Sequence, residues 1–407
     1  MGSSLRHWLQ VSFLNLLLVS LLGVLLRYKI AFSFPYFNQK YLLHGHSHFA
    51  FAGWITQSLM VLMVQWLSRY KGEIVFKEYR LLLYGNLITA YGMLIAFPLQ
   101  GYAFWSICFS TLSIFVSYFF AIRFWKDLNR LTHKSISHYW YKAALIFSVI
   151  SSLGAFSLAF MMANKIMHEK WYLGAVYFFL HFQYNGWFFF AGMGLLVSIL
   201  EKMIPAAKTL KIIFWLFCLA CGPAYFLSAL WMEIPLPIYW LVILAAIAQV
   251  AGWALYVKLL LKEKAAINTG FPVKGRQLLL LSAIALTIKL LLQLGSTHPA
   301  LSQLAFGFRP IVIGYLHLVL LGVVTIFILG YIISMKFLTP GKYFKHGVWI
   351  FISGIIINEI LLMLQGVTGM SYHIIPYINE SLFGTAIILF FGLILLNWQI
   401  RDREQVE

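Results

Sequence analysis

The chain has 407 residues, of which 62% are hydrophobic and 10% are charged, and its formal net charge is +18. So few charges exclude a water-soluble globular fold of this length. Apolar runs of about 20 residues recur along the whole chain, and each is long enough to cross a bilayer as a helix. The runs are continuous rather than alternating, which predicts helices and not the strands of a membrane barrel. Three cysteines do not make a disulfide framework.

The sequence therefore predicts an all-α, polytopic membrane bundle of about twelve transmembrane helices. In chain order, the expected spans are residues 8–27, 41–66, 80–99, 101–124, 140–163, 172–200, 211–231, 237–260, 277–294, 311–335, 346–366 and 382–399. The connections between them are short, so residues 1–407 are expected to form a single transmembrane domain.

The lysines and arginines lie mainly in the short loops between the spans. With a cytoplasmic N-terminus, the cytoplasmic segments hold about four times as many of these residues as the outer segments. This asymmetry predicts that both termini are cytoplasmic in a multi-pass protein of the bacterial inner membrane, with lipid around it. Cations spread over short loops do not indicate a nucleic-acid partner.

The second span opens with three histidines at alternate positions, in "HGHSHFAFAGW". On a helix, residues four apart share a face, whereas residues two apart point in nearly opposite directions. His44 and His48 are therefore expected to face the bundle together. His46 is also a candidate nitrogen ligand, but it joins them only if the start of the helix is irregular.

Other buried polar residues are expected at a similar depth. His181 lies in the sixth span, Lys289 in the ninth, His317 in the tenth and Glu359 in the eleventh. With the predicted orientation, all of them lie in the outer third of the membrane. Ionisable groups in lipid are costly and commonly functional, so these spans are expected to form a site.

Histidine dominates this set of residues, and that narrows the chemistry of the site. Zinc in a protein usually has carboxylate or thiolate ligands as well, whereas imidazoles from separate helices suit haem iron or copper. Aromatic and small residues surround the histidines in "HFAFAGW", "HFQYNGWFFFAGMG" and "GYLHLVLLGVV". Rings and glycines at helical spacing fit around a porphyrin.

With these features, the chain resembles subunit I of the haem–copper oxidase superfamily. That resemblance implies twelve helices, cytoplasmic termini and metal ligands near the outer side. It implies that a low-spin haem lies between the second and tenth spans, held by His44 or His48 and by His317. It also implies that His181 lines a copper or second-haem site, with Tyr184 nearby as a candidate catalytic group.

Three departures from the superfamily's pattern predict an incomplete binuclear centre. The tenth span reads "YLHLV", so Tyr315 stands where the superfamily has a second histidine. The seventh span and its outer loop, "ALWMEIPLPIYW", lack the adjacent histidine pair that binds copper. Tyr184 follows His181 by three residues, whereas the superfamily spaces such a pair by four.

The chain is also similar to the NnrS family of haem- and copper-containing proteins linked to nitric oxide stress. That family has H-x-H followed by a glycine in an early helix, which His46, His48 and Gly53 match. It also has L-H with a glycine five residues beyond the histidine, which His317 and Gly322 match.

Together these features predict a haem-binding membrane protein with haem b as cofactor and copper as a second candidate. Its expected activity is electron transfer, or oxidoreductase chemistry on oxygen or nitric oxide. Since the chain contains no soluble redox domain, electrons would come from a donor subunit, cytochrome c or quinol. Haem propionates need cationic partners, for which Arg309, Lys289, His298 and His373 are candidates.

The alternative is a proton-coupled transporter without a cofactor. Lys289 and Glu359, expected at similar depth, would then form a buried pair that switches with protonation. The sequence offers no paired interrupted helices in corresponding halves, as many transporters have. Pro98 and Pro223 are the candidates for helix breaks.

Overall fold

The computed structural model describes residues 3–166, 168–302, 308–338, 342–371 and 373–401. Within these residues the chain is helical and has no β-strand. Eleven helices are long and apolar enough to cross a membrane, and one bent pair raises the number to twelve. The prediction of an all-α polytopic membrane protein with about twelve spans is therefore confirmed. The orientation of the termini stays a prediction.

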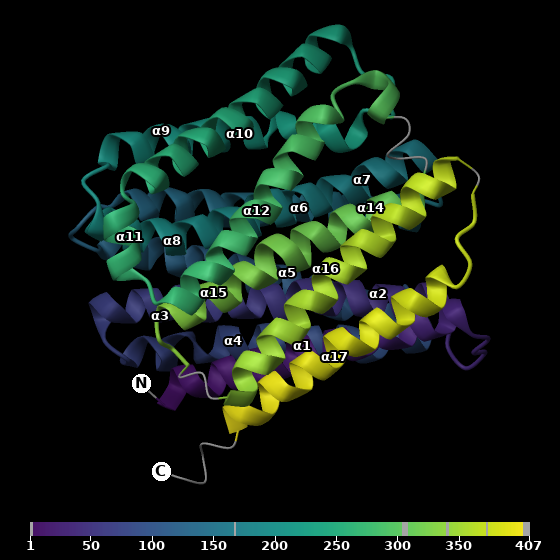
Figure 1. The fold of residues 1–407 in the computed structure, drawn as a ribbon, viewed down its shortest axis with the longest axis horizontal. Coiled ribbons are helices and arrows are strands. Elements are labelled where there is room, and N and C mark those ends of the chain that lie inside the picture. The colour runs from purple at the N-terminus through teal and green to yellow at the C-terminus, as the bar shows by residue number, and fades with distance from the viewer. Residues whose placement is uncertain (1–2, 167, 303–307, 339–341, 372, 402–407) are drawn as a thin grey trace. The chain divides into compact units, whose positions relative to one another are not determined.

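The chain divides into two compact units, residues 1–120 with 335–407 and residues 121–334. The first unit contains α1 (Ser3–Ala31), α2 (Gln39–Phe49), η1 (Ala50–Thr56), α3 (Gln57–Lys71), α4 (Ile74–Gln100), the first part of α5 (Phe104–Arg130), α16 (Lys342–Met370) and α17 (Ile378–Arg401). In Figure 1, α17 lies beside both α1 and α16, with which it makes extensive contact.

The second unit contains α6 (Ile136–Ala163), α7 (Glu169–His181), η2 (Phe182–Phe188), α8 (Phe189–Met203), α9 (Ala207–Cys221), η3 (Pro223–Ala229), α10 (Leu236–Lys262), α11 (Lys264–Gly270), α12 (Val273–Gly295), α14 (Arg309–His317), η4 (Leu318–Thr325) and α15 (Ile326–Ser334). Around α6 lie α7, η2 and α8, whereas α12 packs against α10, η4 and α15.

Among the described spans, the expected span 211–231 has a sharp bend. α9 and η3 meet at an angle of 48° at Gly222. Pro223 follows directly, and because a proline lacks the backbone N–H, it cannot continue the hydrogen-bond ladder of α9. By contrast, Pro98 lies inside the continuous helix α4.

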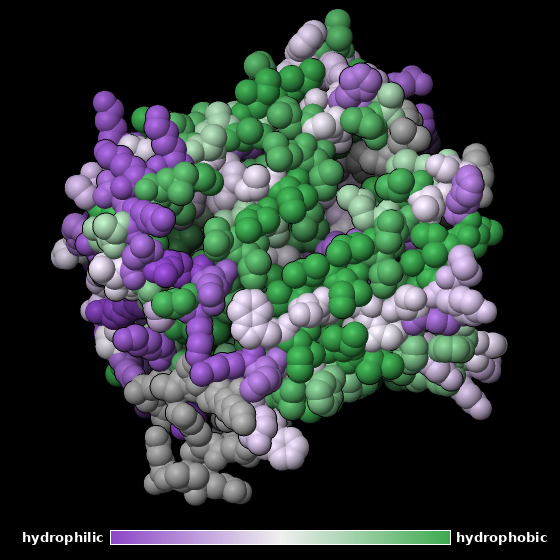
Figure 2. Space-filling model, viewed as in Figure 1, coloured by the Kyte–Doolittle hydropathy of each residue, from purple (hydrophilic) through white to green (hydrophobic). Residues whose placement is uncertain are grey.

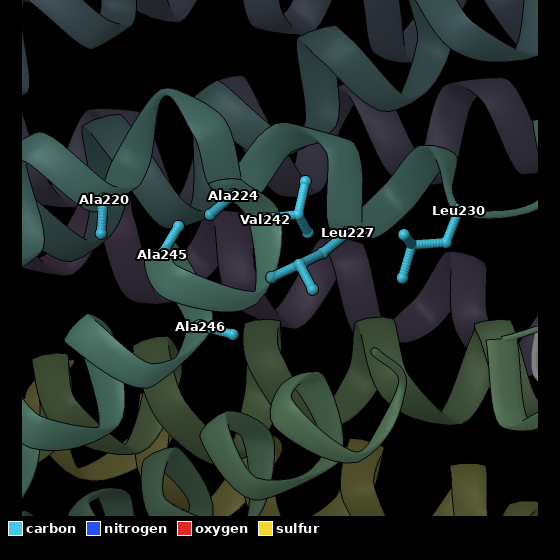
Figure 3. Packing of buried hydrophobic residues seen from close by; sticks show 7 residues of the cluster. All are labelled: Ala220, Ala224, Leu227, Leu230, Val242, Ala245 and Ala246. Carbon is cyan, nitrogen blue, oxygen red and sulfur yellow. The ribbon is translucent and has the colours of Figure 1, made fainter. Parts of the chain in front are cut away.

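Small residues bring helices close together, as is usual where packing rather than the hydrophobic effect joins helices in lipid. In the second unit, Figure 3 shows Ala220 of α9, Ala224 and Leu227 of η3, and Val242 and Ala245 of α10 in one buried cluster. In the first unit, a Cβ atom added to Gly392 of α17 would lie 2.7 Å from the backbone nitrogen of Phe351 on α16.

Large hydrophobic side chains also lie on the surface of both units. Leu81 and Leu99 on α4 are 83% and 73% exposed, and Leu219 on α9 is 70% exposed. The face drawn in Figure 2 is hydrophobic over much of its area. Exposed apolar surface on helices of this length is what a lipid environment requires.

Two of the three spans that carry a histidine between their sixth and thirteenth residues are the most buried spans of the described chain. The span Gln39–Lys71 is 89% buried and the span Glu169–Met203 is 72% buried, whereas the other nine are 17–44% buried. These two helices therefore contact protein on most sides, which makes their polar residues candidates for a site rather than for lipid contact.

Candidate functional site

The three histidines of α2 divide between two faces of the helix. The helix begins at Asn38, whose side chain accepts hydrogen bonds from the backbone N–H groups of residues 40 and 41. The His48 ring stacks on Phe97 of α4 at 4.3 Å, and the His44 ring meets Tyr102 edge-on at 4.7 Å. The shared face expected for His44 and His48 is therefore confirmed.

His46 points away from these two, toward α1. Its Nδ1 lies 3.1 Å from the carbonyl oxygen of Val19. A Cβ on Gly23 would lie 3.6 Å from the His46 ring, so this glycine leaves the ring ordinary van der Waals room. The regular helix thus keeps His46 apart from His44 and His48, as its spacing predicts.

The rings on the shared face differ in their hydrogen bonds. Nε2 of His48 lies 3.0 Å from the Tyr102 hydroxyl. Nε2 of His44 is buried and, among the described residues, has no hydrogen-bond partner. Leaving such an atom unpaired costs about 1–3 kcal/mol. His44 therefore has a nitrogen that a ligand could satisfy.

A π-helical segment follows a histidine on three spans. In the described residues there are three such segments: η1 begins two residues after His48, η2 directly after His181 and η4 directly after His317. Single π-helical turns inside α-helices are rare and occur often at functional sites. This shared feature singles out His48, His181 and His317 from the other histidines.

Side chains from neighbouring helices donate hydrogen bonds to backbone carbonyl groups of these π-helical segments. In the first unit, Asn15 of α1 donates to Gly53 O at 2.6 Å and Asn86 of α4 donates to Ala52 O at 3.0 Å. In the second unit, Ser282 of α12 donates to the backbone oxygen of residue 323 at 2.8 Å. The π-helical turns are thus stabilised by tertiary contacts as well as by their own sequence.

His181 lies in a buried hydrogen-bond network in the second unit. Its Nε2 lies 2.8 Å from Cys221 O, and its Nδ1 lies 3.0 Å from Asn185 Nδ2. The carbonyl accepts and the amide donates, so Nε2 carries the hydrogen and Nδ1 the lone pair. Lys289 Nζ then donates to Asn185 Oδ1 at 2.5 Å. Both ring nitrogens of this fully buried histidine are engaged, so a metal at either would replace a hydrogen bond.

Tyr184 is also buried, and its ring lies 6.5 Å from that of His181. The rings of Tyr184 and Tyr315 lie 6.4 Å apart, and Ser228 and Tyr315 are the polar side chains that interact with the Tyr184 hydroxyl. Tyr315 occupies the position where the resemblance expects a histidine. A catalytic role of Tyr184 stays a prediction.

His317 ends α14, and its Nδ1 lies 2.8 Å from Ile313 O. The carbonyl accepts the Nδ1 hydrogen, which leaves the lone pair on Nε2. Histidines that bind metals usually donate their other ring N–H in this way. At the start of α14, Arg309 is exposed, as are the candidate propionate partners His298 and His373. Only Lys289 among those four candidates is buried.

The predicted pair of Lys289 and Glu359 involves residues of different units. Lys289 bonds Asn185, whereas Glu359 accepts a hydrogen bond from Asn358 at 3.1 Å and interacts electrostatically with Arg27 of α1. Each therefore has a partner within its own unit, and their pairing stays a prediction. The Arg27–Glu359 interaction was not expected from the sequence.

In the part of the chain that the structure describes, no three His, Cys, Asp or Glu side chains gather where they could hold a metal ion. His44, His46, His48, His181 and His317 therefore do not form a protein-only metal centre of three ligands. Haem iron needs only one or two protein ligands, so that finding does not bear on haem.

Sequence reasoning missed an internal repeat that the π-helical segments reveal. His48 and Gly53, His181 and Gly186, and His317 and Gly322 have the same spacing, H-x-x-x-x-G. The first two also share H-F-x-[FY]-x-G-W, and the three copies lie on the second, sixth and tenth spans. Aligning the three histidine-bearing spans with one another would have found this signal.

Asn15, Asn86, Asn185 and Gln249 were likewise not selected from the sequence. Each is at least 95% buried inside a membrane-spanning helix. A survey of buried amides at span centres would have found them, because unpaired amides are costly there. No protein-family model matches the chain, and comparison with curated proteins finds no match.

Proposed function

We propose that this chain is a haem-binding membrane protein of the haem–copper oxidase subunit I type, located in a bacterial inner membrane with both termini cytoplasmic. The observation that carries the proposal is the buried Nε2 of His44, which lies beside aromatic rings and has no hydrogen-bond partner in the described part of the chain. An iron ligand needs an imidazole nitrogen with an available lone pair, and an aromatic surround suits a porphyrin. The π-helical segments next to His48, His181 and His317 support a functional site on the same spans.

Of the three histidines on α2, His44 is the preferred haem ligand. His48 Nε2 already bonds Tyr102, and His46 Nδ1 bonds Val19 O on another face. His317 is the proposed second ligand, because its Nδ1 contact with Ile313 O leaves Nε2 as the basic nitrogen. The pairing of His44 with His317 follows from the resemblance to the oxidase superfamily.

When bound, a haem b would supply reversible one-electron chemistry. The protein residues would fix the imidazoles, exclude water and provide cations for the propionates, with exposed Arg309 the preferred candidate. The activity would be electron transfer, or oxygen or nitric oxide chemistry, with cytochrome c, quinol or another subunit as electron donor. The proposal includes a second site at His181, for copper or a gas.

The test is the visible spectrum of the full-length protein purified from haem-replete cells. We expect a Soret band and, after dithionite reduction, the sharp α-band of a six-coordinate haem b, with pyridine haemochromogen analysis giving the haem type. His44→Ala and His317→Ala should each abolish or shift these bands. A stable, colourless wild-type protein would refute the proposal.

Matched variants separate ligand loss from general damage. His133 lies exposed in the α5–α6 connection, so His133→Ala should leave the spectrum unchanged. His48→Ala removes a ring from the same face as His44 and should retain haem. If His48→Ala loses haem and His44→Ala keeps it, the assignment moves to His48 and the argument from the unpaired nitrogen is wrong.

A further inference from the structure

A small cavity lies in the second unit beside the only buried lysine of the described chain. Lys289 on α12 is 5% exposed, and one of its three possible N–H donors goes to Asn185. Among the described residues, no carboxylate forms an ion pair with it. The titratable groups that face it are Cys221 of α9 and, through Asn185, His181 of α7. A buried ammonium needs hydrogen-bond acceptors, so the cavity is where its remaining N–H groups can find one.

The cavity has a volume of about 10 Å³, which is room for one water molecule. Its polar lining residues are Lys289, Asn185 and Gln249. The rest of its wall is apolar and consists of Phe189, Phe190, Phe217, Leu286 and Leu290. The polar groups come from three different spans.

Gln249 of α10 supplies the second observation. This side chain is 4% exposed, it lines the cavity, and its buried Oε1 has no hydrogen-bond partner among the described residues. A donor on one wall and an unpaired acceptor on another require an occupant that both accepts and donates hydrogen bonds. An anion would satisfy the lysine but not Gln249 Oε1, whereas a water molecule satisfies both.

We propose that this cavity is a hydration site that binds one water molecule between Lys289 Nζ and Gln249 Oε1, and that Lys289 exchanges its proton through this water. A proton that moves from the ammonium group to the water oxygen leaves a neutral amine and a hydronium ion, and the reverse transfer restores both. Asn185 then connects the protonation of Lys289 to His181, because one end of its amide accepts from Nζ and the other donates to His181 Nδ1. This site lies within one unit and does not depend on haem.

The direction in which a substitution of Gln249 changes the melting temperature tests whether the water is present. Gln249→Met preserves length and removes the acceptor. If the cavity is dry, the variant removes an unpaired polar atom and should raise the melting temperature. If water bridges the two groups, the variant deprives the water and Lys289 of a partner and should lower it. We expect a lower melting temperature for the full-length protein in nanodiscs, and an unchanged or higher one would overturn the proposal.

Gln293→Met is the matched control. Gln293 lies on α12 and is 6% exposed, and its Oε1 also has no hydrogen-bond partner in the described structure, but it does not line the cavity. Its replacement should not lower the melting temperature. Infrared difference spectra in H₂¹⁶O and H₂¹⁸O give a direct readout: an isotope-sensitive O–H band should vanish in Gln249→Met and persist in Gln293→Met. Absence of this band from the wild-type protein would overturn the hydration site.

Proton exchange is measured separately. In ¹⁵N-lysine-labelled protein, the Nζ signal of Lys289 is the one that Lys289→Arg moves or removes. Exchange of its hydrogens with D₂O should be slower in Gln249→Met than in the wild type. An equal rate in both proteins would refute the role of the water in proton exchange, even if the water itself is present.

Discussion

The interaction of Asn86 with the π-helical segment η1 gives the sharpest prediction for the first unit. Asn86 is 1% exposed, and its Nδ2 donates to Ala52 O at 3.0 Å and to Gln57 Oε1 at 2.8 Å. Asn86→Leu keeps the approximate volume of the side chain but removes both hydrogen bonds. Ala52 O retains the backbone N–H of Gln57, whereas Gln57 Oε1 loses its donor.

The expected loss follows from these contacts. A side-chain hydrogen bond between membrane helices contributes about 0.6 kcal/mol on average and at most about 1.7 kcal/mol. Two such bonds, together with one buried oxygen left unpaired, predict a destabilisation of about 1–3 kcal/mol. Gln57 Nε2 has no hydrogen-bond partner within the described residues, so the variant would leave neither end of the Gln57 amide with a hydrogen bond there.

Unfolding of the full-length protein by SDS titration in mixed micelles measures this loss. Asn164→Leu is the control, because Asn164 is exposed at the end of α6 and its side chain donates to the carbonyl of Phe160 one turn earlier. It should change stability by less than about 0.5 kcal/mol. An Asn86→Leu protein as stable as the wild type would refute the view that tertiary hydrogen bonds hold the π-helical turn.

Two further predictions concern packing and charge. A Cβ on Gly186 would lie 2.5 Å from Phe147 Cβ, so Gly186→Leu should destabilise the protein by about 1–3 kcal/mol, whereas Gly222→Ala, with no atom within 4 Å, should be nearly neutral in the same SDS titration. Because Arg27 and Glu359 interact electrostatically, the effects of Arg27→Gln and Glu359→Gln on stability should not simply add in the double variant. If the stability losses of the two single variants sum to the loss of the double variant, the cycle contradicts an interaction between Arg27 and Glu359.

The sequence alone determined the class of the protein and the course of its spans. The position of each span depends only on the local sequence, because about 20 consecutive apolar residues must form a helix wherever the surrounding medium is lipid. Helical periodicity also determined that His44 and His48 share a face that His46 does not share. Both results depend only on residues close together in the chain.

Tertiary structure decided which polar groups meet. The sequence suggested Lys289 and Glu359 as a pair from their similar depth, but depth says nothing about which helix is adjacent. Packing brings Lys289 to Asn185, and Arg27 to Glu359. The bend at Gly222 was likewise only a candidate until the geometry of α9 and η3 was known.

Packing also decides which ring nitrogens of each histidine have a hydrogen-bond partner. Neither composition nor spacing distinguishes the paired Nε2 of His48 from the unpaired Nε2 of His44, because their hydrogen-bond partners come from other helices. Packing also contributes to the π-helical segments, because asparagine and serine side chains far away in the sequence donate hydrogen bonds to their backbone carbonyls. Hydrophobicity acts residue by residue, whereas a hydrogen bond needs two groups at one distance and angle, which only the folded chain provides.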